Sequence, residues 1–354
     1  MALALYLIGA PRCGKTAVFD ALTHTPAGPN FTVKGGHRYG TVKVPDARLA
    51  ALRDLYQPKK YTPAEVTFVD VTPPGGEAAK FGEVTGLLGT ADALVLVVQA
   101  FGEFDHAGKP LDPVAQMESV LLELAVCDLE KVERRLERIE HDRQRSGKAP
   151  EVERRALQRC KEQLEKEQPL RTLEFHGEEE KILRTFQFLS LKPLLVVADI
   201  AEARLDGSGL ESLEAAASER GLTLLRFCAP LEAEIASLDP AEQAAFLKDY
   251  GLAEPARLRL IHAAYRALKL ASFFTVGEDE VRAWTISDGT AAQAAAGKIH
   301  TDMERGFIRA ETVSAEALLK AGAWSKCRED GTLRLEGKEY VVRDGDVINF
   351  RFGA

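Results

Sequence analysis

Cysteine is scarce in this chain, and its distribution shows no pattern. Among 354 residues there are 5 cysteines, an odd number, and their spacing is that of neither a zinc site nor a disulfide framework. We therefore expect free thiols in a reducing compartment and a cytoplasmic location. The cysteines are Cys13, Cys127, Cys160, Cys228 and Cys327.

Positive charge is not in excess either. Lys and Arg together number 46 against 54 Asp and Glu, which gives a formal net charge of -8. This balance excludes a chain that coats nucleic acid through its overall charge, and we expect no DNA partner. A local basic face remains compatible with it.

The apolar run at the start of the sequence is short. Residues 1–8 have no basic segment before them, and Gly9 ends the run. Such a run is too short for a signal peptide or a membrane span, so we interpret it as a strand and expect no membrane partner.

What the sequence does contain is a series of apolar, β-branched segments separated by stretches long enough for crossover helices. The length favours two or three domains, and the segments are typical of the central strands of a parallel sheet. We predict an α/β fold with a doubly wound sheet, interrupted by an insertion. The predicted strands are residues 3–8, 66–69, 93–98, 193–198 and 222–227.

The interruption, residues 114–190, is rich in Glu, Arg, Leu and Gln. Leu129, Val132, Leu136 and Ile139 recur at steps of three and four, and a second stripe follows a turn near residue 147. We predict two antiparallel helices that form a coiled-coil hairpin. Its charges are dense but balanced in sign, which leaves open a solvated arm or an arm that binds a partner.

The last part of the sequence differs in texture. Residues 255–270 predict an amphipathic helix that closes the first domain, and short strands and turns follow in a small α+β module. The predicted domains are residues 1–113 with 191–271 for the doubly wound sheet, 114–190 for the helical insertion, and 272–354 for the C-terminal module.

A glycine-bounded loop directly after the first strand carries the clearest chemistry. Backbone N–H groups of such a loop, with the N-terminus of the next helix, bind phosphate. We expect Lys15 to reach the β- and γ-phosphates and assist the reaction, and the Thr16 hydroxyl to bind Mg²⁺, with Asp70 at a strand end completing the metal site. The loop residues are Gly9, Ala10, Pro11, Arg12, Cys13, Gly14, Lys15, Thr16 and Ala17.

Together with other segments, this loop resembles the YchF-type branch of the Obg-related P-loop nucleotidases. The resemblance covers almost the whole length and implies a nucleotide domain, a coiled-coil insertion and a C-terminal TGS domain with a β-grasp fold. It also implies the ribosome or translation-linked RNA as a partner, through the TGS domain and the helical arm. The matching segments are residues 39–49, 68–70, 272–285, 297–311 and 343–352.

The resemblance places the base site after the fourth predicted strand. The branch carries Asn-x-x-Glu there and is associated with adenine, whereas this chain has Asp199 and Glu202. An ionised Asp only accepts hydrogen bonds, which still permits recognition of the adenine amine. We expect ATP or ADP in preference to GTP or GDP, with Cys228 and Ala229 in a second base-edge loop. The alternative is that Asp199 and Glu202 only cap the next helix.

Hydrolysis of a bound nucleotide would need further residues besides the phosphate-binding loop. By resemblance, His106 is the water-orienting residue on a mobile loop, and Thr32 is the nearest candidate for a metal-sensing threonine. Asp70 is followed by Pro73 and Pro74, and proline lacks the N–H that would meet a γ-phosphate. The leading hypothesis is a slow ATPase that acts as a translation-linked switch. A nucleotide-binding scaffold without turnover, a GTP-binding protein and a small-molecule kinase are the alternatives.

Overall fold

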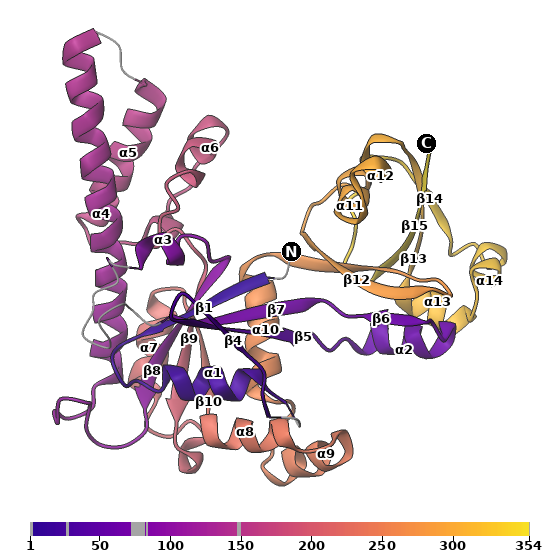
Figure 1. The fold of residues 1–354 in the computed structure, drawn as a ribbon, viewed down its shortest axis with the longest axis horizontal. Coiled ribbons are helices and arrows are strands. Elements are labelled where there is room, and N and C mark those ends of the chain that lie inside the picture. Colours follow the sequence, from indigo (N-terminus) through magenta and orange to yellow (C-terminus); the bar gives the residue numbers. More distant parts are fainter. Residues whose placement is uncertain (1–2, 26–27, 72–81, 83, 147–149, 354) are drawn as a thin grey trace. The chain divides into compact units, whose positions relative to one another are not determined.

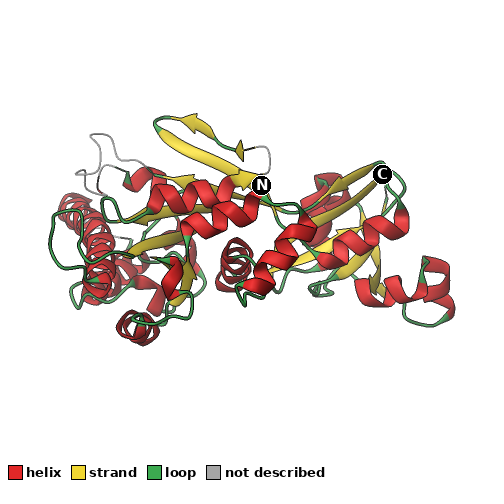
Figure 2. Ribbon diagram, turned by 90° about the horizontal axis from the view of Figure 1, so that it is seen from below, coloured by secondary structure: helices red, strands yellow, loops and turns green. Residues whose placement is uncertain are grey.

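The computed structural model describes residues 3–25, 28–71, 82, 84–146 and 150–353, and it divides into two compact units. One unit contains residues 3–41 and 67–260, and the other contains residues 42–66 and 261–353. Both units combine helices with strands (Figures 1 and 2). Residues 42–66 thus pack with the C-terminal part of the chain, while the domain boundaries given above stay a prediction.

A seven-stranded sheet forms the centre of the larger unit. All five predicted strands are present in it, and β1, β8, β9 and β10 pair in parallel with their neighbours. Two short strands, β2 (His24–Thr25) and β3 (Gly28–Pro29), pair separately. The order in the large sheet is β10 (Thr223–Phe227), β9 (Leu194–Ile200), β8 (Ala93–Ala100), β1 (Leu3–Gly9), β7 (Glu65–Asp70), β5 (His37–Lys43) and β4 (Thr32–Lys34).

Helices pack on this sheet because its central strands are apolar on both faces. Tyr6 and Ile8 of β1 share a core with Met117 and Val120, so Leu5 and Leu7, which alternate with them, face the other side. This burial fixes the end of β1 and with it the start of the loop that follows. Outside the helical hairpin, the described helices and short helical turns that begin in this unit are α1 (Lys15–Thr23), α3 (Thr85–Leu88), η3 (Glu202–Arg204), α7 (Glu211–Glu219), α8 (Ala229–Ser237), α9 (Pro240–Asp249) and α10 (Ala256–Ala267), which continues into the other unit.

The predicted helical hairpin is confirmed. The long helix α4 (Pro113–Ser146) runs beside α5 (Glu151–Leu164) (Figure 1). The apolar stripes of both helices meet in one core. The chain then continues through η2 (Leu170–Thr172) and α6 (Glu178–Arg184). The fully buried carboxylate of Asp128 accepts hydrogen bonds from the N–H groups of Leu189 and Ser190, so it joins α4 to the returning chain.

The C-terminal unit is built on a mixed sheet of six strands. Its edge strand β6 (Lys60–Thr62) comes from far upstream and pairs in parallel with β12 (Glu280–Ser287). The other strands and the helices of this unit are α2 (Ala47–Tyr56), β11 (Leu270–Thr275), α11 (Ala292–Ile299), α12 (Thr301–Arg305), β13 (Phe307–Ser314), α13 (Ala315–Ala321), α14 (Trp324–Glu329), β14 (Arg334–Glu336) and β15 (Asp346–Phe352).

The helix predicted over residues 255–270 is shorter in the structure. It ends at Ala267, Lys269 adopts a left-handed conformation with φ of 49°, and β11 begins at Leu270. The sequence pattern did not reveal this break, because Leu270 is an apolar, half-buried residue at the start of β11 and therefore continues the periodicity of the helix. In the part of the chain that the structure describes, no helix combines the length and the apolarity of a membrane span.

Candidate functional site

The loop between β1 and α1 has the backbone geometry of a tight phosphate-binding turn. Gly14 lies at φ of 94°, and a Cβ atom there would overlap the Asp199 carboxylate, so both conformation and space require glycine. A Cβ atom on Gly9 would lie 2.5 Å from the Val97 carbonyl oxygen. The two glycines are therefore needed for the close approach of the loop to β8 and β9.

The first turn of α1 presents its N–H groups without a competing anion. Gly14 is the N-cap residue, no side chain caps the helix, and the first turn contains no acidic residue. Backbone N–H groups and the positive end of the helix dipole remain available for an anion, which is the arrangement that binds phosphate. The neighbouring thiol does not contribute a charge, because burial raises the pKa of Cys13 to about 11.

The carboxylate of Asp70 lies beside this helix start. It ends β7, it is 1% exposed, and its Oδ2 accepts a hydrogen bond of 3.1 Å from the Thr16 hydroxyl. Lys15 Nζ lies 3.6 Å from Asp70 Oδ1, and that oxygen accepts no hydrogen bond from the described residues. The sequence prediction for Asp70 was based on its strand-end position, and the sheet order indeed places β7 next to β1.

The Thr16 hydroxyl and the Asp70 carboxylate are suited to a Mg²⁺ ion that is bound together with a nucleotide. Mg²⁺ uses one or two protein oxygens and otherwise phosphate and water oxygens, and a hydroxyl with an adjacent carboxylate supplies that set. A cluster of three or more His, Cys, Asp or Glu side chains, which an all-protein metal site would need, is absent from the described residues.

Arg38 is a member of this site that the sequence did not reveal. From β5 its guanidinium donates to Asp70 Oδ2 through Nε at 3.2 Å and Nη2 at 2.8 Å, and to Asp20 Oδ1 through Nη1 at 2.8 Å. The rings of Phe19 and Phe31 hold it at 5.0 and 5.1 Å. No motif includes Arg38, and only the order β1, β7, β5 in the sheet brings it to Asp70.

The segment predicted to contact the base lies at the end of β9. Asp199 is 4% exposed, its Oδ1 accepts a hydrogen bond of 3.3 Å from the Ala229 N–H, and burial raises its pKa to about 7. Cys228 is buried and is the N-cap residue of α8. Asp199 thus lies between Gly14, where an added Cβ would overlap its carboxylate, and the predicted base-edge residues Cys228 and Ala229.

Glu202 occupies a different environment. It is exposed at the start of a short helical turn and accepts a hydrogen bond of 2.9 Å from the Tyr250 hydroxyl. Neither Asp199 nor Glu202 supplies a side-chain cap to that turn or to α7. The helix N-terminus that Asp199 does contact is that of α8, through the Ala229 N–H.

The remaining predicted residues are not joined to the phosphate loop in the described structure. His106 is exposed in a small loop that Asp105 closes by accepting from the N–H groups of Ala107 and Lys109. Thr32 is exposed on β4 and pairs with Tyr39. Pro73 and Pro74, and the glycines after them, lie outside the described residues.

The strand, the glycine-bounded loop, the helix that begins at Lys15 and the carboxylate on the adjacent strand are together the architecture of P-loop nucleotide-binding proteins. Comparison with known proteins gives the branch. The chain is 40% identical over 368 residues to "Ribosome-binding ATPase YchF" of Bacillus subtilis, covering 99% of this chain and 100% of that protein. It is 34% identical to "Obg-like ATPase 1" of Caenorhabditis elegans, covering 99% and 92%. The chain belongs to the YchF/Obg-like ATPase family.

Solved structures and a family model agree with this assignment. The "Structure of the Schizosaccharomyces pombe YchF GTPase" matches with a TM-score of 0.85 and 28% identity, covering 99% of this chain and 97% of that one. A GTP-binding protein from Pyrococcus horikoshii, at 17% identity and a TM-score of 0.61, shares the fold alone. The family model YchF-GTPase_C, described as a protein of unknown function (DUF933), matches residues 270–353.

Proposed function

We propose that this protein is a Mg²⁺-dependent P-loop nucleotidase that prefers ATP, hydrolyses it slowly to ADP and phosphate, and acts as a ribosome-associated switch in the cytoplasm. The observation that carries the nucleotide part is the Thr16 hydroxyl, 3.1 Å from the buried Asp70 carboxylate, at a helix start whose N–H groups are uncapped. The names of the relatives, ribosome-binding ATPases among them, support the reaction and the partner.

In this proposal the chain's own residues bind and orient the phosphates. The N–H groups of Gly14 to Ala17 receive the β-phosphate, and Lys15 pairs with the phosphate oxygens farther along the nucleotide. Thr16 and Asp70 would hold Mg²⁺, which when bound neutralises charge on the phosphates. His106 would orient the attacking water only after its loop moves over the site, which is one reason to expect slow turnover.

The preference for adenine rests on the carboxyl of Asp199. A protonated carboxyl has one donor and one acceptor, as an Asn amide does, and so can donate to the adenine N7 and accept from the N6 amine. The raised pKa of Asp199, about 7, makes this protonated form accessible near neutral pH. Cys228 and Ala229 would border the same base edge.

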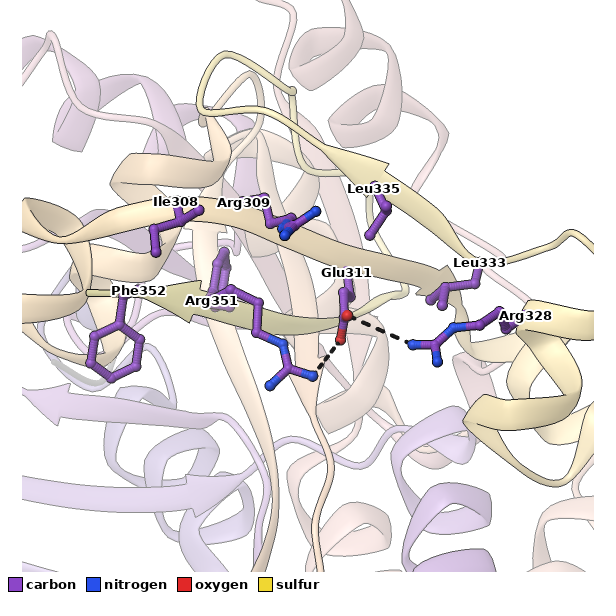
Figure 3. A pocket seen from close by; sticks show the side chains of 9 residues that line it. Ile308, Arg309, Glu311, Arg328, Leu333, Leu335, Arg351 and Phe352 are labelled. Atoms are coloured by element: carbon purple, nitrogen blue, oxygen red, sulfur yellow. Dashed lines mark hydrogen bonds and ion pairs between the residues drawn. The ribbon is translucent and has the colours of Figure 1, made fainter. Parts of the chain in front are cut away.

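The ribosome-associated part is supported by an exposed face of the C-terminal sheet (Figure 3). Arg309 and Arg351 lie directly opposite each other on β13 and β15, although like charges in this position repel. Glu311 pairs with Arg351 at 3.0 Å and with Arg328 at 3.8 Å, whereas no ion pair of Arg309 is present among the described residues. The exposed side chains of Ile308, Leu335 and Phe352 lie beside these charges.

The experiment that tests the nucleotide part measures binding and turnover together. Calorimetry with ATP, ADP, GTP and GDP, each with and without Mg²⁺, is expected to give the tightest binding for the adenine nucleotides with Mg²⁺. Single-turnover assays at high protein concentration are expected to release phosphate faster than Lys15→Ala does. Tighter binding of GDP than of ADP would overturn the base assignment.

A nucleotide-binding scaffold without turnover is the competing function, and two observations favour it. Arg38 holds the metal-site carboxylate, and the predicted His106 lies in a separate exposed loop. Adenine nucleotide binding with no phosphate release above the Lys15→Ala control would select this alternative.

A further inference from the structure

Arg38 changes the formal charge of the cluster of ionisable side chains around Asp70. Without Arg38, the cluster of Lys15, Asp70 and Asp20 has a formal charge of -1, which attracts a divalent cation. The guanidinium makes the cluster neutral, and its two N–H groups occupy Asp70 Oδ2 at 3.2 and 2.8 Å. A Mg²⁺ ion approaching Thr16 therefore meets a carboxylate that already has a cation.

Arg38 is also held firmly in this position. Its guanidinium bridges Asp70 and Asp20, its side chain is 20% exposed, and it contacts the faces of Phe19 and Phe31. Such fork-like and cation–π contacts are stronger than those of an exposed surface arginine. The ion pair between Arg38 and Asp70 is consequently a stable contact of the site, and breaking it costs free energy.

Asp70 Oδ1 is the oxygen that remains for the metal's water shell. It is buried and accepts no hydrogen bond from the described residues, and Lys15 Nζ lies 3.6 Å away. If Mg²⁺ binds at this side while Arg38 stays, the positive charge of the guanidinium repels the metal. If Arg38 moves aside instead, its contacts with Asp70 and Asp20 must first be broken. Arg38 therefore opposes metal binding in both cases.

We propose that Arg38 is a built-in competitor of Mg²⁺ at Asp70, and that it sets the concentration of free Mg²⁺ that the protein requires to hold a nucleotide. The inference rests on the proposed nucleotide binding and adds a residue that determines its metal dependence. The protein then binds Mg²⁺-nucleotide weakly when free Mg²⁺ is low, although its phosphate loop is complete.

The test is a titration of free Mg²⁺, set with EDTA buffers, at a fixed concentration of a fluorescent ADP analogue. Arg38→Ala is expected to lower the midpoint for free Mg²⁺ about tenfold or more relative to wild type, because one opposing charge is removed. Asp20→Asn is expected to shift the midpoint in the opposite direction, since Arg38 then pairs with Asp70 alone.

Controls separate this effect from damage to the fold. Arg38→Gln keeps most of the side-chain volume and is expected to shift the midpoint like Arg38→Ala, and circular dichroism checks that each variant is folded. Arg184→Ala removes an exposed i,i+4 ion pair with Glu180 on α6 and is expected to leave the midpoint unchanged. Equal midpoints in wild type, Arg38→Ala and Arg38→Gln would overturn the competition. If neither the wild type nor any variant binds the analogue at any Mg²⁺ concentration, the proposed nucleotide binding is wrong, and the inference about Arg38 is wrong with it.

Discussion

Asp199 shows how a single residue can couple nucleotide binding to pH. Burial raises the pKa of its carboxyl from an ordinary value of 3.8 to about 7, because the charged form is deprived of its hydrating water. The neighbouring thiols of Cys13 and Cys228 also have raised pKa values and remain neutral, so of these three groups Asp199 is the one that changes charge near pH 7.

From this shift we predict a pH-dependent affinity for ADP. Below pH 7 the carboxyl is protonated and can donate to the base, whereas above pH 7 it is ionised and only accepts. Wild-type affinity is expected to fall by up to about tenfold per pH unit above the pKa. Calorimetry between pH 6 and pH 8.5 measures this effect. Asp199→Asn is expected to bind ADP at pH 8.5 as tightly as wild type does at pH 6, with a flat profile.

The sign for stability follows from the same shift. Between pH 4 and pH 7, roughly, the folded protein keeps a proton on Asp199 that the unfolded chain has released, so the free energy of unfolding falls as pH rises through this window. Asp199→Asn is expected to remove this contribution in urea unfolding, while Asp249→Asn, an exposed acid at the end of α9, keeps it. An unchanged wild-type profile in Asp199→Asn would show that the carboxyl is ionised throughout.

Among the elements, the helical hairpin of α4 and α5 is joined to the returning chain by one buried carboxylate in α4. Asp128 is fully buried and accepts from two backbone N–H groups and from the Ser190 hydroxyl at 2.7 Å. Asp128→Ala would leave these donors buried without partners, which costs about 3 kcal/mol of unfolding free energy. Urea unfolding measures the decrease, and hydrogen exchange is expected to rise over residues 186–190. Glu137→Ala, an exposed site on the same helix, is the control and is expected to change neither; equal effects of both variants would contradict the role of Asp128.

The elements also show what the sequence can and cannot predict. Five of the seven strands of the large sheet and the helical hairpin were predictable because burial on two faces or on one stripe leaves a local pattern, as in β8 and α4. The strands β4 and β5 were not predicted, because β4 is exposed and β5 is only partly buried. The phosphate loop was predictable because its glycine spacing, followed by Lys15 and Thr16, is a local motif between a strand and a helix. Arg38 was not, since its contact with Asp70 depends on the sheet order, which no local pattern records.

At the scale of the whole molecule, we propose that the exposed face of the C-terminal sheet that carries Arg309 and Arg351 binds ribosomal RNA. We predict that the double variant Arg309→Ala/Arg351→Ala reduces co-sedimentation with ribosomes and makes binding less dependent on salt, by about one unit of slope for each phosphate that the variant no longer neutralises. A salt titration of co-sedimentation measures both. The control Arg305→Ala/Arg343→Ala removes two exposed arginines that do not line the pocket around Arg309 and Arg351, and it is expected to keep the wild-type slope. Equal slopes in both double variants would remove this face from the proposed interface.

The pairing of β6 with β12 has a consequence for synthesis of the chain. Lys60 is the register partner of Glu280, a separation of 220 residues, and Leu49 and Leu52 of α2 are buried in the same core as Phe274. At ordinary translation rates the early segment waits about 10–40 s for its partners. During that time its apolar side chains have no core of their own, so the nascent chain is exposed to aggregation or chaperone capture until the last strands leave the exit tunnel.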